Sequence, residues 1–360
     1  SVWITTNPRL VASPVGRVVR VASGDHPIGH QIVMGYVDYS RQIDSEGEMT
    51  SRRKFILAMG AAALIAGSAQ AETWRDKYPE LVLAIVPAEN ATGVIERYKP
   101  FVDYLSKELG VKVTLRVAND YTAVIEGQKN KQIHIGFYGP GAYARANSVS
   151  GGNVVPFVTT RNSDGSIGYY SVMYVRSDSS FQSVEDLKGK TLGYVDVEST
   201  SGYKAPNYFL TQQGFPIDKH FKLAQTTGSH ENAVLALAAG TVDAAVNWWN
   251  SETDSNLTRM LNKGMVKKID GTVMTIGDFR VIWKSPLLPG SPFAYLADFP
   301  EDMKAAIAKA FLDAPQKSKE AFAKLSDGKD LGFVQVTAKD YEESVKMNLW
   351  LDAQRKKRAS

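Results

Sequence analysis

The clearest pattern in the chain is an alternation of short apolar runs with segments whose apolar residues recur every three or four positions. Residues 81–86 form an unbroken apolar run, which predicts a strand buried on both faces. The next segment spaces Phe101, Leu105 and Leu109 by four, which predicts a helix that ends at Gly110. Because strand and helix patterns keep alternating, the sequence predicts βαβ units built around mainly parallel sheets.

The same patterns continue to the end of the chain. Further strands are predicted at 111–117, 133–138, 154–159, 169–175, 191–195, 242–246 and 280–284. Further helices are predicted at 121–127, 230–239, 301–312, 317–325 and 338–355, and a loop followed by a helix at 199–213. The order gives one α/β unit, then a second, then a return to the first, with lobe 1 at 72–176 and 287–360 and lobe 2 at 177–286. Two crossings between lobes form a hinge, and the cleft beside it can enclose a ligand.

A different pattern precedes the first predicted strand. Basic residues at 52–54 lead into an apolar run that ends at Ala69-Gln70-Ala71. This order predicts a secretory signal peptide at 49–71, cleaved after Ala71, and hence a periplasmic protein. Its Ser-Arg-Arg-x-Phe-Ile string is of the twin-arginine type. Because such a signal acts at an N-terminus, we expect translation to start at Met49 and residues 1–48 to be non-native upstream sequence without a fold; a disordered native extension is the alternative.

Composition and charge exclude several classes of function. Hydrophobic residues make up 44% and charged residues 22% of the chain, as in soluble globular proteins. There is no cysteine, which rules out disulfides, thiolate metal sites and a cysteine nucleophile. A net charge of +4 without long basic runs argues against nucleic acid as a partner. No cofactor or metal is predicted, because histidines and acids do not cluster with metal-ligand spacing.

Two polar strings suit the binding of a compact anion. Ser199, Thr200 and Ser201 supply three hydroxyls just before a predicted helix, whose N-terminal N–H groups favour anions. Ser229 is the predicted N-cap of another helix, which places His230 in its first turn as a donor to an oxyanion. Simple helix capping and a structural histidine are common alternatives. The residues alone leave both interpretations open.

Four strings, in their order and spacing, resemble the phosphonate/phosphite/phosphate-binding periplasmic proteins of ABC importers. They are Asp120-Tyr121, Ser199-Thr200-Ser201-Gly202, Ser229-His230-Glu231-Asn232-Ala233 and Ile282-Trp283-Lys284-Ser285-Pro286-Leu287-Leu288-Pro289-Gly290. The similarity extends over residues 81–345. It implies the α/β fold of a type II periplasmic binding protein, with two α/β lobes joined by a two-crossover hinge. It also implies a monomer that is not an enzyme, captures a small phosphorus oxyanion by hinge closure and delivers it to an ABC permease.

The resemblance further implies which residues bind the ligand. Ser199 to Ser201 and His230 are expected on lobe 2, and Tyr121 on lobe 1 is expected to close over the ligand. Tyr138 ends a predicted strand at a similar edge. Because neighbouring strand side chains face opposite ways, one of Tyr169 and Tyr170 should face the cleft, and the resemblance favours Tyr170. Packing in the core is the alternative for Tyr138 and Tyr170.

Two departures from the family pattern concern the ligand. Some relatives bind aminoalkylphosphonates and place acids near the amine. Ser291 stands at one of these positions, and the other falls on Asn250 in an ungapped match or on Glu252 after a two-residue shift. Losing one acid weakens an ammonium site, and Trp248 and Trp249 narrow the pocket. We therefore expect a small ligand without an amine, such as phosphite or methylphosphonate.

Other functions stay open at this point. A periplasmic sensor of a similar oxyanion would use the same closure, and a sulfonate is a further candidate ligand. An exported phosphoester or phosphonate hydrolase would use Ser199 and His230 as nucleophile and base. The hydrolase is the less favoured alternative, because the sequence has neither a Gly-x-Ser-x-Gly elbow nor a metal motif.

Overall fold

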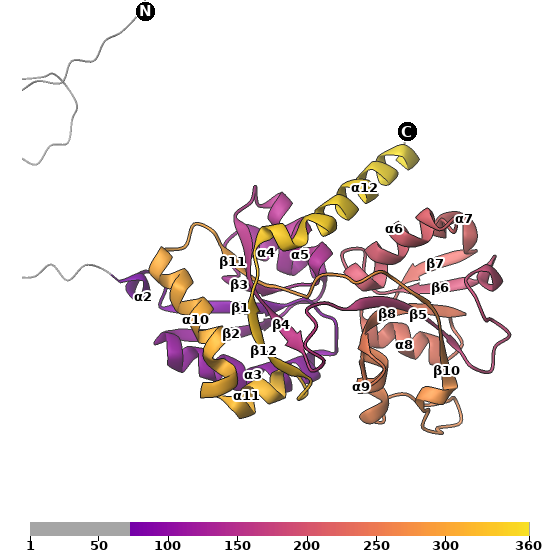
Figure 1. The fold of residues 1–360 in the computed structure, drawn as a ribbon, viewed down its shortest axis with the longest axis horizontal. Coiled ribbons are helices and arrows are strands. Elements are labelled where there is room, and N and C mark those ends of the chain that lie inside the picture. Colours follow the sequence, from indigo (N-terminus) through magenta and orange to yellow (C-terminus); the bar gives the residue numbers. More distant parts are fainter. Residues whose placement is uncertain (1–72, 360) are drawn as a thin grey trace, which may run out of the picture. The chain divides into compact units, whose positions relative to one another are not determined.

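The computed structural model describes residues 73–359, all within one compact unit that contains two β-sheets. Each sheet is the centre of one lobe (Figure 1). The expected upstream sequence and signal peptide, residues 1–71, lie outside the described residues. Among the residues that are described, no helix is both long enough and apolar enough to cross a membrane.

Lobe 1 is built on a six-stranded sheet of mixed direction. The strands in spatial order are β12 (Asp330–Gln335), β4 (Val154–Asn162), β11 (Phe293–Leu296), β3 (Ile135–Phe137), β1 (Glu80–Ile85) and β2 (Lys112–Val117). Strand β1 pairs in parallel with β2 and β3, whereas β11 and β12 make antiparallel pairs. The apolar run predicted at 81–86 therefore forms the buried strand β1.

The helices of lobe 1 pack around this sheet. They are α2 (Trp74–Lys77), α3 (Ala91–Leu109), α4 (Tyr121–Lys129), α5 (Pro140–Val149), α10 (Glu301–Lys317), α11 (Lys319–Leu325) and α12 (Glu342–Ala359). Helix α3 ends as predicted at Gly110, whose φ of 68° lies in the left-handed region that favours glycine. Its Phe101 is fully buried and meets Phe311 of α10 edge to face at 5.1 Å. This aromatic packing joins α3 and α10 in the core of lobe 1.

Lobe 2 is built on a second mixed sheet. Its strands in spatial order are β10 (Phe279–Lys284), β5 (Tyr170–Arg176), β8 (Ala244–Ser251), β6 (Thr191–Tyr194) and β7 (Leu223–Thr226), with β9 (Asp254–Ser255) paired to β8. The helices are α6 (Ala205–Gln212), α7 (Ile217–His220), α8 (His230–Ala238) and α9 (Asn256–Asn262). Short 3₁₀ turns cover Glu185–Leu187, Ile276–Asp278 and, in lobe 1, Ala338–Tyr341.

The expectation of mainly parallel sheets is wrong. Antiparallel pairs join β5 to both β8 and β10 in lobe 2, and β11 to both β3 and β4 in lobe 1. After each crossover the chain enters the next sheet as a strand, β5 or β11, that runs antiparallel to its neighbours. The local helix and strand patterns were correct here, but they do not encode the direction in which a returning strand pairs.

Two adjacent crossovers connect the lobes. The first covers residues 163–169, and the second covers 285–292. Tyr169 and Leu288 exchange backbone N–H···O bonds of 3.1 and 2.8 Å, which ties the crossovers together. Gly168 is required beside them, because a Cβ there would lie 2.6 Å from the Leu288 carbonyl oxygen. Since β5 belongs to the lobe 2 sheet, the lobe boundary expected at 176 lies one strand too late.

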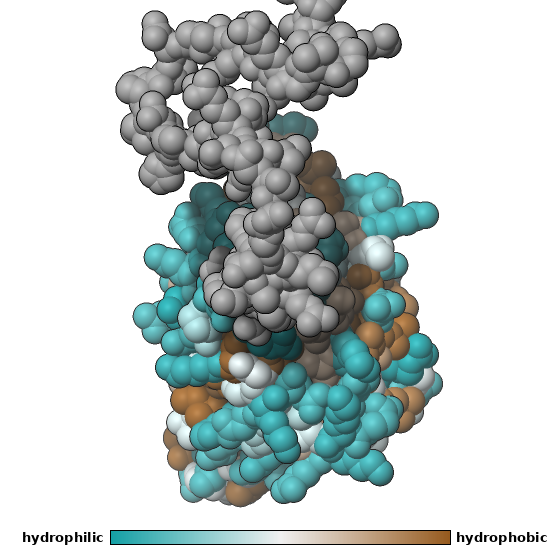
Figure 2. Space-filling view, turned by 90° about the vertical axis from the view of Figure 1, so that its left-hand side faces the viewer, coloured by the Kyte–Doolittle hydropathy of each residue, from teal (hydrophilic) through white to brown (hydrophobic). Residues whose placement is uncertain are grey.

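The end of lobe 1 away from lobe 2 is largely hydrophilic where it is visible in Figure 2. Helix α10 shows the underlying pattern. Its Met303 and Ile307 are fully buried, whereas Glu301 and Asp302 in the first turn are exposed. The helix therefore presents one apolar stripe to the core and a charged surface to solvent.

Candidate functional site

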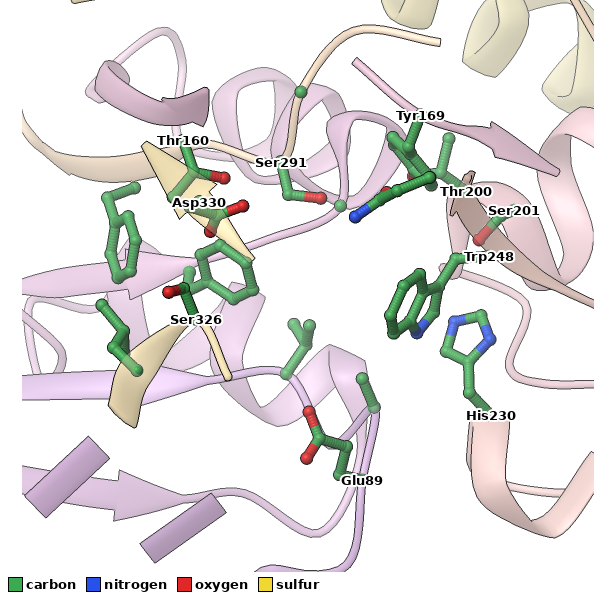
Figure 3. Close-up of a pocket in the computed structure, with 18 of the residues that line it drawn as sticks. Glu89, Thr160, Tyr169, Thr200, Ser201, His230, Trp248, Ser291, Ser326 and Asp330 are labelled. Atoms are coloured by element: carbon green, nitrogen blue, oxygen red, sulfur yellow. The ribbon is translucent and has the colours of Figure 1, made fainter. Parts of the chain in front are cut away.

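A cavity of about 170 Å³ lies between the lobes. It receives residues from both lobes and from both crossovers (Figure 3). At one end, here called the donor end, lie Tyr121, Tyr169, Ser199, Thr200, Ser201 and His230. At the other, here called the far end, lie Thr160, Ser326 and Asp330. The cavity is thus polar at both ends and is shared between the two halves of the hinge.

The three hydroxyls of the donor end sit on a short loop, residues 199–204, between β6 and α6. Ser199 caps a π-helical turn, Thr200–Lys204, that leads directly into α6. The extra turn explains how Pro206 is accommodated, because it falls at the start of α6, where no helical N–H is needed. A Cβ on Gly202 would lie 2.3 Å from Val195, so glycine lets the loop pack closely on the strand end. We call residues 199–201 the hydroxyl loop.

The hydroxyl loop also contacts lobe 1 directly. Thr200 Oγ1 accepts a hydrogen bond of 2.8 Å from the backbone N–H of Gly141 in α5. Gly139 lies equally close, since a Cβ there would be 2.8 Å from Thr200 Oγ1. Because the Thr200 oxygen is the acceptor in this bond between the lobes, its hydroxyl proton remains available for donation.

His230 opens α8 as predicted and lies next to the hydroxyl loop. Its Nε2 is 3.3 Å from Ser199 Oγ, and its Nδ1 is 2.7 Å from Asn247 Oδ1. The Asn247 amide is oriented by donating to the His230 carbonyl, so its Oδ1 is an acceptor and Nδ1 carries the proton. Burial lowers the pKa of His230 to about 4. At neutral pH Nε2 therefore carries a lone pair, to which the Ser199 hydroxyl donates.

Two tyrosine hydroxyls complete the donor end. Tyr121, the first residue of α4, is buried, and burial raises its pKa while a hydrogen bond with Ser199 opposes the rise. Tyr169 lies on the first crossover. Burial raises the pKa of Tyr169 to about 12, against the effect of hydrogen bonds with Thr200, Ser201 and Ser291. Tyrosines from two different elements thus converge on the hydroxyl loop.

Tyr169, and not Tyr170, lines the cavity. Tyr170 packs against Trp249 at 5.7 Å between ring centroids, with the Lys284 ammonium 3.8 Å from its ring centre. The expected alternation of the two side chains is present, but its phase is the reverse of the one we favoured. Strand β5 begins at Tyr170, so the pleat of that strand did not determine how Tyr169 on the crossover points.

Tyr138 is in the core of lobe 1 and does not line the cavity. It is fully buried, and its hydroxyl donates to Gln128 Oε1 at 2.7 Å. The strand end that carries Tyr138 does approach the hydroxyl loop, but it does so through Gly139. Core packing, the alternative interpretation, therefore describes this residue.

The end of β8 and the residue after it show which of the two candidate positions lies at the cavity. Asn250 lines the cavity and donates to Asp254 Oδ2 at 2.8 Å. Glu252 is exposed and lies on a separate hollow of lobe 2. Only one of the two tryptophans, Trp248, narrows the cavity. The acids expected near a ligand amine are thus represented at the cavity by neutral Asn250 and Ser291.

Charged residues that were not predicted from the sequence line the cavity away from the donor end. Glu89 forms an ion pair with Arg97, whose Nη1 also donates to the Leu325 carbonyl at 2.7 Å. Burial raises the pKa of Asp330 to about 6, although the charges of Arg259 and Arg97 act against this rise. Arg259 reaches across from lobe 2. Glu89 lies in the loop before α3, Arg97 on α3, Arg259 on α9 and Asp330 on β12, and no motif in the sequence marks these four residues as neighbours.

The lobes also touch beside the cavity. The His230 N–H donates to the Ala88 carbonyl at 3.2 Å, and the Asn90 N–H donates to Glu231 at 2.8 Å. Arg259 of α9 pairs with Asp327 of lobe 1 at 3.3 Å. Such contacts exist only when the lobes are together, so they belong to a closed arrangement around the cavity.

No cluster of three or more potential metal ligands occurs within residues 73–359. Ser199 and His230 are close enough to suggest a nucleophile and its base. However, the second imidazole nitrogen bonds an amide instead of a carboxylate, and the serine oxygen accepts the Gly202 N–H at 3.1 Å. Two lobes, a hinge of two crossovers and a cavity between the lobes with neutral donors at one end together define a solute-binding protein.

Comparison with known proteins identifies the family. The model of the periplasmic phosphonate substrate-binding proteins of ABC transporters matches residues 83–341. The "Phosphonates-binding periplasmic protein" of Escherichia coli is 32% identical over 65% of this chain and 65% of its own length. The "Phosphate-import protein PhnD" of Mycolicibacterium smegmatis is 28% identical over 82% of this chain and 95% of its own length.

A solved structure agrees with these matches. The binding protein component of an ABC phosphonate transporter from Pseudomonas aeruginosa superposes with a TM-score of 0.64 at 27% identity. The match covers 76% of this chain and 86% of that chain. The protein therefore belongs to the family of periplasmic phosphonate-binding proteins of ABC transporters. It has the type II periplasmic binding protein fold, and its family is one of binding proteins and not of enzymes.

Proposed function

We propose that this protein captures a phosphonate or phosphite in the periplasm by closing its lobes, and that it delivers the ligand to an ABC permease. The observation that carries the proposal is the donor end, where three serine and threonine hydroxyls, two tyrosine hydroxyls and an imidazole converge on one small volume. A tetrahedral anion that leaves water needs several donors around it. The family match and the names of the relatives support the same ligand class.

Closure follows from the distribution of these donors. The hydroxyl loop and His230 belong to lobe 2, whereas Tyr121 belongs to lobe 1 and Tyr169 to a crossover. A ligand held by both lobes stabilises the closed form by the contacts that the open form lacks. The hydrogen bond between Thr200 and Gly141 also stabilises the closed form, and it does not depend on a ligand.

His230 sets the protonation state of the complex. With its Nδ1 proton committed to Asn247, the neutral ring accepts at Nε2. A ligand monoanion can donate its P–OH to this lone pair, whereas a dianion requires a protonated imidazole. In both cases about one proton lies between the ring and the ligand. We therefore expect binding to take up about one proton at a pH where the free ligand is a dianion.

The rest of the cavity favours a small ligand. Asn250 and Ser291 are neutral, and Glu89 is already paired with Arg97. Asp330 lies in the field of two arginines. None of these groups is a free partner for a ligand ammonium, so phosphite and methylphosphonate are preferred over aminoalkylphosphonates.

The test is calorimetric titration of the protein with phosphite, methylphosphonate, 2-aminoethylphosphonate, phosphate and sulfate. We expect saturable binding of the phosphorus compounds, and we expect methylphosphonate or phosphite to bind most tightly. Repeating the titration in buffers of different ionisation enthalpy measures the proton uptake. Absence of binding by every phosphorus compound would contradict the proposed function.

We further propose that the protein is exported as a monomer by the twin-arginine route and cleaved after Ala71. The signal-like residues 49–71 support this route. Expression of a chain that starts at Met49 should yield a periplasmic protein whose first residue is Glu72. Replacement of Arg52 and Arg53 by lysine should leave the precursor in the cytoplasm. N-terminal sequencing of the two cell fractions checks both outcomes.

A further inference from the structure

Two oppositely charged residues bracket the hydroxyl loop. Glu198 precedes it, and Lys204 is the last residue of the π-helical turn. Lys204 is completely buried, and its Nζ donates to Glu198 Oε2 at 2.5 Å. Neither residue lines the cavity. The ion pair therefore links the two ends of the segment that carries Ser199, Thr200 and Ser201, from behind.

The same lysine reaches lobe 1. Its Nζ donates to the Gly141 carbonyl at 2.9 Å, while the Gly141 N–H donates to Thr200 Oγ1 at 2.8 Å. Both polar atoms of one lobe 1 residue are thus bound by the loop of lobe 2. A Cβ on Gly141 would lie 2.8 Å from Lys204 Cδ, so the approach depends on glycine.

Glu198 extends the charge pattern further into lobe 1. Arg145 Nε of α5 lies 3.7 Å from Glu198 Oε2. The guanidinium of Arg145 makes two hydrogen bonds, of 2.9 and 2.7 Å, to Asp352 on α12. Positive and negative groups therefore alternate from Lys204 to Asp352, crossing from the hydroxyl loop to the C-terminal helix.

Helix α12, where this network ends, contacts both lobes. It packs on α5 of lobe 1 and on α6 of lobe 2, which follows the loop directly. Trp350 meets Tyr208 of α6 edge to face at 5.3 Å, and Arg358 pairs with Asp218 of lobe 2 at 3.0 Å. Asn348 donates to the same Gly141 carbonyl that Lys204 uses. Helix α12 thus contacts both lobes beside the hydroxyl loop.

The energetic cost of the arrangement argues for a role. Burial lowers the pKa of Lys204 to about 8, against the effect of Glu198. A buried charge is costly unless its partner stays in place, so the pair resists any loop conformation that separates it. The Gly141 and Arg145 contacts lie on the other lobe and are lost when the lobes part. Their stabilising effect is therefore restricted to the closed form.

We propose that Lys204 and Glu198 are positioning residues of the anion site, which hold the hydroxyl loop in its donor geometry and couple it to lobe 1 in the closed form. The inference rests on the proposed function, because the loop is taken as the ligand-binding loop. Apparent affinity falls by the fraction of molecules in the binding-competent form, so loss of the coupling weakens binding without removing any ligand contact.

The test compares Lys204→Met, Glu198→Gln and the double variant with wild type, using methylphosphonate. Lys222→Met and Glu185→Gln are the controls, since both residues are exposed on lobe 2. We expect each single variant to lose about tenfold or more in affinity. The double variant should lose no more than the weaker-binding single variant, because the residues act as one unit. The controls should bind like wild type.

Variants of the outer part of the network keep the proposal testable if the variants of the buried pair fold poorly. Asp352→Asn and Arg145→Gln leave the buried pair intact, and we expect a loss of about threefold that appears mainly in the dissociation rate. Melting curves establish that each variant is folded. Folded single variants that bind as tightly as wild type overturn the proposal and leave the proposed function standing.

A ligand-free readout separates the proposal from the proposed function. Because the chain has no cysteine, Ala305→Cys and Ser180→Cys place one label on each lobe. We expect Glu198→Gln to lengthen the mean distance between the labels relative to wild type. An unchanged distance overturns the coupling. Wild type that binds no phosphorus compound instead contradicts the proposed function, whatever the labels show.

Discussion

The two ends of the interlobe cavity are both polar, but the donor end is neutral, whereas charged groups line the cavity away from it. The donor end consists of hydroxyls and an imidazole that is neutral when the site is empty. Away from it lie charged groups that largely compensate one another, such as Glu89 with Arg97. Neutral, fixed dipoles bind an anion without repelling each other when it is absent. The comparison indicates that the ligand brings the only net charge to the donor end.

The largest effect we expect concerns the neutral state of His230. Burial lowers its pKa to about 4, from the usual 6.5 of a histidine. Between these values the unfolded chain binds a proton that the folded protein does not. The stabilisation is therefore complete above pH 6.5 and is lost as the pH falls toward 4, by roughly 3 kcal/mol in total. Urea unfolding of ligand-free wild type and His230→Gln at pH 7, 6, 5 and 4 should show a shallower decline in the variant.

The control for that measurement is ligand-bound wild type. Since binding is expected to take up about one proton where the free ligand is a dianion, the difference in stability between liganded and free protein should grow as the pH falls through that range and level off where the free ligand is a monoanion. Parallel declines of wild type and His230→Gln would show that the imidazole is not held neutral. The donor end would then resemble the charged remainder of the cavity.

Removing individual donors should come next in size. Ser199→Ala and His230→Ala should each weaken anion binding by roughly 1–3 kcal/mol, the scale for losing a partner of a charged group. Calorimetric titration with methylphosphonate measures the change, with Ser180→Ala, an exposed serine of lobe 2, as the matched control. If His230→Ala binds like wild type, the anion does not occupy the donor end.

Adjacent tyrosines give a finer test of the same boundary. Tyr169→Phe removes a hydroxyl from the donor end and should weaken binding by about 1 kcal/mol, or roughly fivefold. Tyr170→Phe is the matched variant, since its ring packs on Trp249 outside the cavity, and its affinity should not change. The opposite result would place the ligand nearer to Tyr170 than the cavity allows.

The smallest effect on binding is expected at Asp330. Burial raises its pKa to about 6, so the folded state binds a proton more readily than the unfolded chain. Ionised Asp330 therefore lowers stability as the pH rises from 4 to 6. Asp330→Asn should stabilise the protein by roughly 3 kcal/mol at pH 7 and by nothing at pH 4. Methylphosphonate affinity should change by less than about twofold.

The control for Asp330→Asn is to measure both its stability and its methylphosphonate affinity at pH 7 and at pH 4. A large loss of affinity in this variant would mean that the ligand reaches the far end. In that case 2-aminoethylphosphonate should also be bound more tightly by wild type than methylphosphonate, and the distinction between the two ends would be one of ligand contacts. Calorimetry with both compounds separates the outcomes.

Much of the lobe architecture could be predicted because its determinants are local. The apolar run at 81–86, the i, i+4 pattern ending at Gly110 and the cap at Ser229 each give the expected element. Strand β12 and helix α5 escaped prediction. Helix α5 is short and rich in small residues, and β12 is half exposed, so neither carries a strong periodic signal.

The candidate site divides in the same way. Ser199, Thr200, Ser201, His230 and Tyr121 lie at the cavity because a cap or a strand end fixes each of them locally. Asn250 does so as well, in the ungapped register. By contrast, Tyr138, Tyr170 and Glu252 depend on which face of a strand or loop meets the other lobe, and the structure places them away from the cavity.

The amino-acid sequence by itself determined the elements, their capping residues and a hydroxyl loop suited to an anion, because these follow from short-range periodicity and hydrogen bonding. Only the tertiary structure decided that Tyr169 faces the cavity, that the sheets are mixed, and that Lys204 and Asp352 belong to one network across the lobes. Those features arise where distant segments meet, and no local pattern specifies the geometry of such a meeting.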